Sequence, residues 1–227
     1  MTESGGESVD GQATNATGVA ALGTALVVLT ALPMLAFPSP LTLGIGFPLV
    51  SSALVAVAGF LVVGGGYWLA TAGVGRGSVV LAGLAVALIQ TGYGLFGAAA
   101  RWLVAPTVRV PALGLVAGFV GAITAATAVT VFRSERSFAG WRRYAAALLG
   151  GGFVVVAAVS LTTPSFVVLA GVAVLPGAVV DLTHGIWAVR ETEYDSTVLN
   201  AVGVYAAVTG VFVHGFRLAV RLLGDGE

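Results

Sequence analysis

The stretch SFVVLAGVAVLPGAVVDLTHGIWAVR, residues 165–190, is an apolar run that contains a single acid, Asp181. A helix needs about 20 predominantly apolar residues to cross a bilayer, and this run is long enough. Arg190 marks its end, and a rise of about 1.5 Å per residue puts Asp181 roughly 13 Å below that end. An ionisable group at this depth costs roughly 2.5–3.5 kcal/mol on insertion scales, and such groups usually have a function. The stretch therefore predicts a transmembrane helix that carries a functional acid.

The composition of the whole chain agrees with this interpretation. Of 227 residues, 58 % are hydrophobic and 9 % are charged, and the mean hydropathy is +1.02. A soluble domain has about 45–50 % apolar and about 25 % charged residues, so we expect an integral membrane protein. The chain contains neither cysteine nor lysine, which excludes disulfides, cysteine metal sites and Schiff-base chemistry. Its net charge of zero gives no indication of a nucleic-acid partner.

Seven apolar segments of this kind follow one another along the chain. We predict an all-α membrane protein, a bundle of seven transmembrane helices that forms a single domain over residues 16–223. Residues 1–15 are expected to be a disordered polar tail because they are rich in Gly, Ser and acids, and residues 224–227 are a short C-terminal tail. The helices are predicted at about residues 16–37, 43–72, 78–100, 110–132, 144–162, 165–189 and 198–220.

Glycines and prolines indicate where these helices bend or pack. The glycines at residues 64–66 are expected to interrupt the second segment. Pro176 is expected to kink the sixth segment, because proline removes one backbone hydrogen bond. For the GxxxG pair Gly114 and Gly118, and for the glycines at residues 150–152, close helix packing inside the bundle is preferred over a dedicated dimer interface.

The arginines indicate the orientation of the bundle. With seven spans, the loops on the N-terminal side hold six arginines and the other side holds four. One loop alone carries four of the six, at Arg133, Arg136, Arg142 and Arg143. The positive-inside rule therefore predicts a multi-pass protein of the cell membrane with a cytoplasmic N-terminus.

Three ionisable side chains are candidates for a site of ion passage or pH sensing: Asp181, His184 and His214. His184 shares a helix face with Asp181 because it lies three residues further on. The preferred hypothesis is a titrating group that lines an ion or proton path. The alternative is a protonated carboxyl group that is hydrogen-bonded to a neighbouring helix. His214 is expected either to face the bundle or to belong to a basic helix end with Arg217 and Arg221.

The same residues give little support to other chemistry. Two histidines thirty residues apart, in a chain without cysteine, do not have metal-ligand spacing. One acid and two histidines without a nucleophile make a poor active site, and no phosphate-binding loop is present. We therefore expect neither an enzyme nor a resident cofactor.

Four ordered landmarks in the second half resemble the Bax inhibitor family of seven-span membrane proteins. They are ITAATAVTVF at residues 123–132, SFAGWRRYAAALLGGGFVVVAAVSL at 137–161, VLPGAVVDLTHGI at 174–186 and VLNAVGVYAAVTGVFVHGFRLAVRLLG at 198–224. In the third, Asp181 takes the aspartate position of the family signature, Val180 the tyrosine position, and the threonine is displaced to Thr183. The resemblance covers roughly residues 122–224 and suggests a divergent prokaryotic member.

The resemblance implies a pH-sensitive leak channel for Ca²⁺ or other cations, closed by two aspartates that share a proton. Here Asp181 supplies the first aspartate, while Ala207 or Val211, depending on the alignment, stands at the second position. We therefore hypothesise that Asp181 pairs with His184 or His214 instead of a second acid. The implied ligand is transient Ca²⁺ or another cation, and the surroundings are the lipid bilayer.

A second function class fits the same sequence. The glycine-rich faces, the acidic N-terminal tail and the missing second aspartate suit a non-conducting membrane scaffold. Such a protein would regulate a partner within the membrane, for example a quality-control protease. Stoichiometric co-purification of a partner, together with tight liposomes, distinguishes this alternative from a channel.

Overall fold

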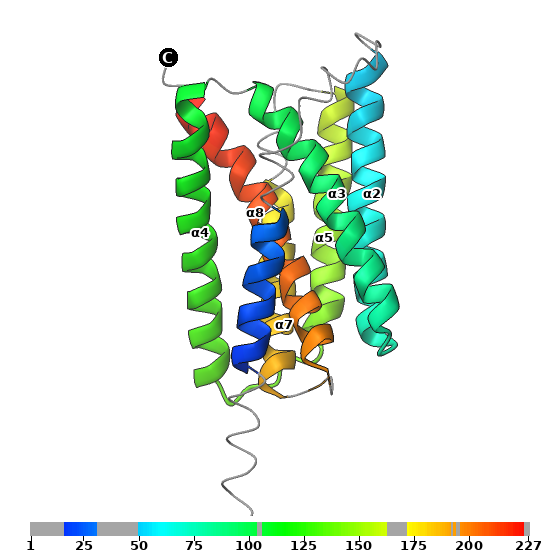
Figure 1. Cartoon of the computed structure of the whole chain (residues 1–227), viewed down its shortest axis with the longest axis vertical. Coiled ribbons are helices and arrows are strands. Elements are labelled where there is room, and N and C mark those ends of the chain that lie inside the picture. The colour runs from blue at the N-terminus through cyan, green and yellow to red at the C-terminus, as the bar shows by residue number, and fades with distance from the viewer. Residues whose placement is uncertain are drawn as a thin grey trace, which may run out of the picture. The chain divides into compact units, whose positions relative to one another are not determined.

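The computed structural model describes residues 16–30, 50–103, 106–162, 172–191, 193 and 196–224. These residues form helices, and no strand occurs among them, so the all-α prediction is confirmed. Each of the seven predicted segments contains a helix (Figure 1). After a first helical stretch at residues 16–30 come α2 Val50–Gly75, α3 Val79–Leu103, α4 Pro106–Arg133, α5 Trp141–Thr162, the 3₁₀ turn η2 Val172–Val174, α7 Leu175–Arg190 and α8 Thr197–Gly224.

Two stretches of the described chain are long and apolar enough to cross a membrane. They are Val110–Arg133 in α4 and Val172–Arg190, which joins η2 to α7. The apolar helical stretches Ala16–Thr30, Val79–Tyr93 and Thr197–Phe212 are shorter. Length and composition thus support a membrane-embedded chain at two of the predicted spans. The predicted N-terminal tail, residues 1–15, lies outside the described residues.

The predicted single domain consists of two compact units that share α8. The first comprises residues 1–105 and 194–206, and the second comprises residues 106–193 and 207–227. Since α8 begins in the first unit and ends in the second, the unit boundary falls within one continuous helix. Each unit has its own internal packing, and the candidate site lies in the second.

In the first unit, α2 and α3 form a hairpin whose glycines bring the two helices together. A Cβ atom at Gly66 would lie 2.8 Å from Cγ1 of Ile89, and one at Gly92 would lie 2.6 Å from Cγ2 of Val63. The expected interruption at residues 64–66 is therefore wrong: α2 is continuous, and Gly66 provides space for the neighbouring helix. The turn between the helices uses Gly77 at φ 64°, a conformation that glycine adopts without steric cost.

Polar contacts also connect distant parts of the first unit. Gln90 donates a hydrogen bond of 3.3 Å from Nε2 to the carbonyl of Leu26. The hydroxyl groups of Thr30 and the fully buried Tyr205 lie 2.6 Å apart, and the Tyr67 hydroxyl donates to the carbonyl of Ala206. The first bond joins α3 to the first helical stretch, the second joins that stretch to α8, and the third joins α2 to α8. All three satisfy polar groups that lie away from water.

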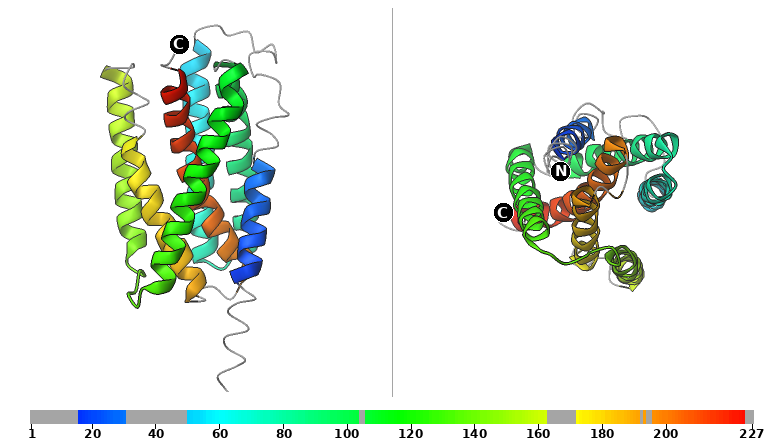
Figure 2. Two further views of the ribbon diagram at one scale, coloured as in Figure 1. Left: turned by 90° about the vertical axis from the view of Figure 1, so that its left-hand side faces the viewer. Right: turned by 90° about the horizontal axis from the view of Figure 1, so that it is seen from below.

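In the second unit, α7 packs closely against α5, and the two helices run side by side in Figure 2. A Cβ atom at Gly177 would lie 2.6 Å from the backbone nitrogen of Leu149, and one at Gly152 would lie 2.8 Å from the carbonyl oxygen of Ala173. Since Gly177 follows Ala173 while Leu149 precedes Gly152, the helices are antiparallel. The close packing predicted for residues 150–152 is thus found at Gly152, and Gly177 supplies a second close contact.

Two other expectations about the second unit are wrong. Pro176 does not kink a helix, because α7 begins at Leu175 and Pro176 lies in its first turn. Proline is tolerated there because the N–H groups of a first turn have no intrahelical acceptor. Gly114 and Gly118 do not pack closely either, since no described atom would lie within 4 Å of a Cβ atom at either position.

Candidate functional site

Asp181 lies on the face of α7 that approaches α5. It follows Gly177 by one helical turn, and Ala145 precedes Leu149 by one turn, so the antiparallel register puts Asp181 opposite Ala145. Ala145 is fully buried, whereas Asp181 is half-buried. A charged residue of α5 also acts on the acid.

This residue is Arg142, in the first turn of α5. It is half-buried, and its positive charge acts on both the Asp181 carboxyl group and the His184 ring. Arg142 lies almost one turn before Ala145, on the side of α5 that meets this part of α7. The sequence places Arg142 among the loop arginines, whereas the structure gives Asp181 a cationic neighbour there.

His184 is buried in α7 and faces the loop between α4 and α5. Its Nδ1 atom lies 3.3 Å from the carbonyl oxygen of Phe138. When Nδ1 donates to this carbonyl it carries the ring proton, which leaves Nε2 as an acceptor in the neutral ring. The ring stacks on Trp187 at a centroid distance of 5.6 Å, and Phe138 makes an edge-to-face contact of 4.7 Å with Trp141. These contacts hold His184 against the loop.

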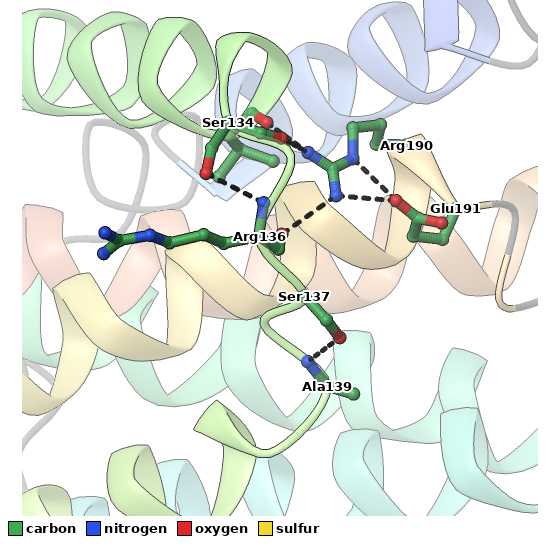
Figure 3. Close-up of polar contacts among 7 residues, drawn as sticks. Ser134, Arg136, Ser137, Ala139, Arg190 and Glu191 are labelled. Carbon is green, nitrogen blue, oxygen red and sulfur yellow. Dashed lines mark hydrogen bonds and ion pairs between the residues drawn. The ribbon is translucent and has the colours of Figure 1, made fainter.

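Arg190, at the end of α7, ties the same loop to α4 (Figure 3). Nη1 donates hydrogen bonds of 2.5 Å to the carbonyl oxygens of Val131 and Ser134. Nη2 donates one of 3.2 Å to the backbone carbonyl oxygen of Arg136. The last carbonyls of a helix have no partner within that helix, so the guanidinium group satisfies the end of α4. Glu191 pairs with Arg190 at 2.6 Å. Arg190 therefore fixes the loop that supplies the partner of His184.

His214 is half-buried in α8, next to Gly215. A Cβ atom at Gly215 would lie 3.1 Å from Cδ1 of Phe119, so this part of α8 is close to α4. The pairing of Asp181 with His184 or His214 stays a prediction; the observed hydrogen-bond partner of His184 Nδ1 is the Phe138 carbonyl. The side chains of Arg217 and Arg221 lie outside the described residues.

The chemistry of this arrangement is that of one acid among basic and aromatic groups. Within the described part of the chain, no group of three or more His, Asp or Glu residues could hold a metal ion. Trp187 adds a buried indole N–H without an acceptor among the described residues. Sequence reasoning missed Arg142 and Arg190 as parts of the site. The available signal was the absence of an acid in the first turn of α5, where two arginines stand instead.

Comparison of the chain with the models of known protein families, with curated proteins and with solved structures finds no match.

Proposed function

We propose that this chain is a multi-pass protein of the cell membrane that conducts or senses cations, with Asp181 in the ion path. Its apolar composition and two stretches long enough to cross a bilayer support a membrane protein. The seven apolar segments and the distribution of the arginines along the sequence support seven spans with a cytoplasmic N-terminus. The ordered landmarks that resemble the Bax inhibitor family support a pH-sensitive leak channel for Ca²⁺ or other cations. Asp181 is then the group that attracts the ion.

The observation that carries the proposal is the position of Asp181, opposite the buried Ala145 and within range of the charge of Arg142, on a helix whose other residues are mostly buried. A carboxylate with a neighbouring guanidinium group is stabilised when the path is empty. A cation that enters competes with Arg142 for the carboxylate. A proton removes the negative charge altogether, so the attraction is present near neutral pH and is lost in acid.

This assignment replaces the second aspartate of the family latch by an arginine. The positions that align with that aspartate, Ala207 and Val211, are both buried and apolar. We propose that Arg142 balances the charge of Asp181 when no ion is bound. His184 and His214 then modulate the path through their own protonation.

Calcium and proton flux into proteoliposomes, measured from about pH 5 to about pH 8, tests this function. Asp181→Asn is expected to abolish the pH-dependent component. Arg142→Gln is expected to raise flux several-fold at neutral pH, because the carboxylate loses its counter-charge. Glu135→Gln, which changes an exposed loop acid, is the matched control and should behave like the native chain. A flux and pH profile unaffected by Asp181→Asn would remove Asp181 from the path.

A second candidate function, a non-conducting scaffold, is favoured by an open surface on α4. Gly114, Gly118 and Gly121 are exposed, and no described atom would lie within 4 Å of a Cβ atom at any of them. Small residues of this kind allow another transmembrane helix to approach closely. Such a scaffold could regulate a membrane protease, for example. Two results together would support this function: vesicles that remain tight, and a stoichiometric partner that co-purifies with the native chain but not with Gly118→Leu.

A further inference from the structure

The end of α4, the following loop and the start of α5 carry exposed basic and aromatic side chains that the proposed ion path does not use. We call them the basic loop surface and define it as Arg133, Arg136, Trp141, Arg143 and Tyr144. All five are exposed. Arg142, which acts on Asp181, is half-buried and is not part of this surface.

The arginines of this surface are available to an external ligand. Figure 3 shows the Arg136 side chain directed away from the Arg190 cluster, which engages only the Arg136 backbone. Arg143 lies over the Tyr144 ring, with its guanidinium carbon 5.4 Å from the ring centroid. Glu191, an acid nearby, is already paired with Arg190. The exposed acid Glu135 lies between Arg133 and Arg136 and offsets one of the three arginines of the surface, so the surface keeps a net positive charge.

The basic loop surface lies at the ends of two stretches that could cross a membrane, and this position indicates its ligand. Both stretches with the length and composition of a membrane span, Val110–Arg133 and Val172–Arg190, end at this loop. Trp and Tyr side chains favour the level of the lipid headgroups, and arginines beside a span attract anionic headgroups. Trp141 and Tyr144 are 37 % and 55 % exposed, which is unusual for a protein interior but suits this interfacial zone.

We propose that the basic loop surface binds the headgroups of anionic phospholipids. The guanidinium groups of Arg136 and Arg143 contact the phosphates, while Trp141 and Tyr144 lie at the headgroup level. This inference rests on the membrane embedding that forms part of the proposed function, but it does not depend on ion conduction. It accounts for cations in the first turn of α5, where the helix dipole alone disfavours them.

A labelled loop tests the proposal. Since the chain contains no cysteine, Ala139→Cys gives one unique site on the exposed loop for a fluorophore. The labelled full-length chain is reconstituted in phosphatidylcholine vesicles with a minor fraction of brominated phosphatidylglycerol or brominated phosphatidylcholine. Stronger quenching by the anionic lipid is expected. Neutralising each arginine should reduce the local enrichment of the anionic lipid over phosphatidylcholine about five-fold. This factor is the equivalent of ~1 kcal/mol for one basic residue at an anionic surface.

Variants and conditions separate the outcomes. Arg136→Gln with Arg143→Gln should make the two lipids equal quenchers, whereas Arg76→Gln, on the exposed turn between α2 and α3, should leave the preference unchanged. High salt should weaken the preference by screening. Equal quenching in the native chain, a preference that survives the double variant, or saturable displacement by inorganic phosphate at constant ionic strength would each overturn the proposal. Since brominated phosphatidylcholine alone reports membrane contact, a failed preference remains distinguishable from a failure of membrane embedding or of flux.

Discussion

Replacement of Gly177 by alanine tests the register of α5 and α7, on which the position of Asp181 depends. The new Cβ atom would lie 2.6 Å from the backbone nitrogen of Leu149 and 3.0 Å from the backbone carbon of Leu148. Backbone atoms of a helix cannot rotate away as a side chain does, so the two helices must separate. Overpacking of this kind costs about 1–3 kcal/mol. The helix propensity of alanine, about 1 kcal/mol better than that of glycine, offsets part of this loss.

Gly114→Ala is the matched control, because it makes the same chemical change in a helix where no described atom lies within 4 Å. Alanine gains helix propensity over glycine at both sites, and no more at Gly177, in the first turn of α7, than at Gly114, inside α4, so this gain does not favour Gly177→Ala. We therefore expect Gly177→Ala to be less stable than Gly114→Ala by about 1–3 kcal/mol. The free energy of unfolding is measured by reversible denaturation in mixed micelles. Equal stability of the two variants would refute the close approach of α5 and α7, and with it the placement of Asp181 opposite Ala145.

Three further changes test other parts of the structure. Arg190→Ala should destabilise the chain by about 1.5–3 kcal/mol, because the carbonyls of Val131 and Ser134 lose a charged donor; a loss below the error of the same unfolding assay would contradict this role. Tyr205→Phe should cost about 1 kcal/mol, and a double-mutant cycle with Thr30→Val should show that the two hydroxyl groups are coupled; additive losses would show that they are independent. Ala145→Leu should destabilise by about 1–3 kcal/mol and alter flux, since it fills the buried position opposite Asp181; native stability would place that position outside the core.

Much of the helical structure follows directly from the sequence. The seven apolar segments predict the helices. The seventh, 198–220, corresponds to α8 Thr197–Gly224, and the sixth, 165–189, ends next to the end of α7, which begins only at Leu175, after η2. The errors concern residues with two structural uses. Proline occurs both at kinks and at helix starts, and Pro176 lies at a helix start. Glycine can interrupt a helix or allow close packing, and Gly66 allows close packing. Which use applies depends on neighbours that are distant in the sequence.

The candidate site was predictable only in part. An acid inside an apolar run is visible in the sequence, because the cost of burying it makes Asp181 exceptional. Its surroundings are not visible, since Arg142 and Ala145 precede it by more than thirty residues. The expected pairing of Asp181 with His184 or His214 stays a prediction. The Phe138 carbonyl that His184 Nδ1 meets is a backbone group that no side-chain pattern reveals.

By itself, the sequence determined the helical class, most of the approximate helix bounds and the place of Asp181 along its helix, because hydrophobicity and helical rise are local properties. Only the tertiary structure decided that Arg142 acts on Asp181, that the Phe138 carbonyl contacts His184, and that Arg190 caps α4. These pairings depend on the register between helices. That register is set by close contacts such as Gly177 against Leu149, which arise from the shapes of two helix surfaces and not from either segment alone.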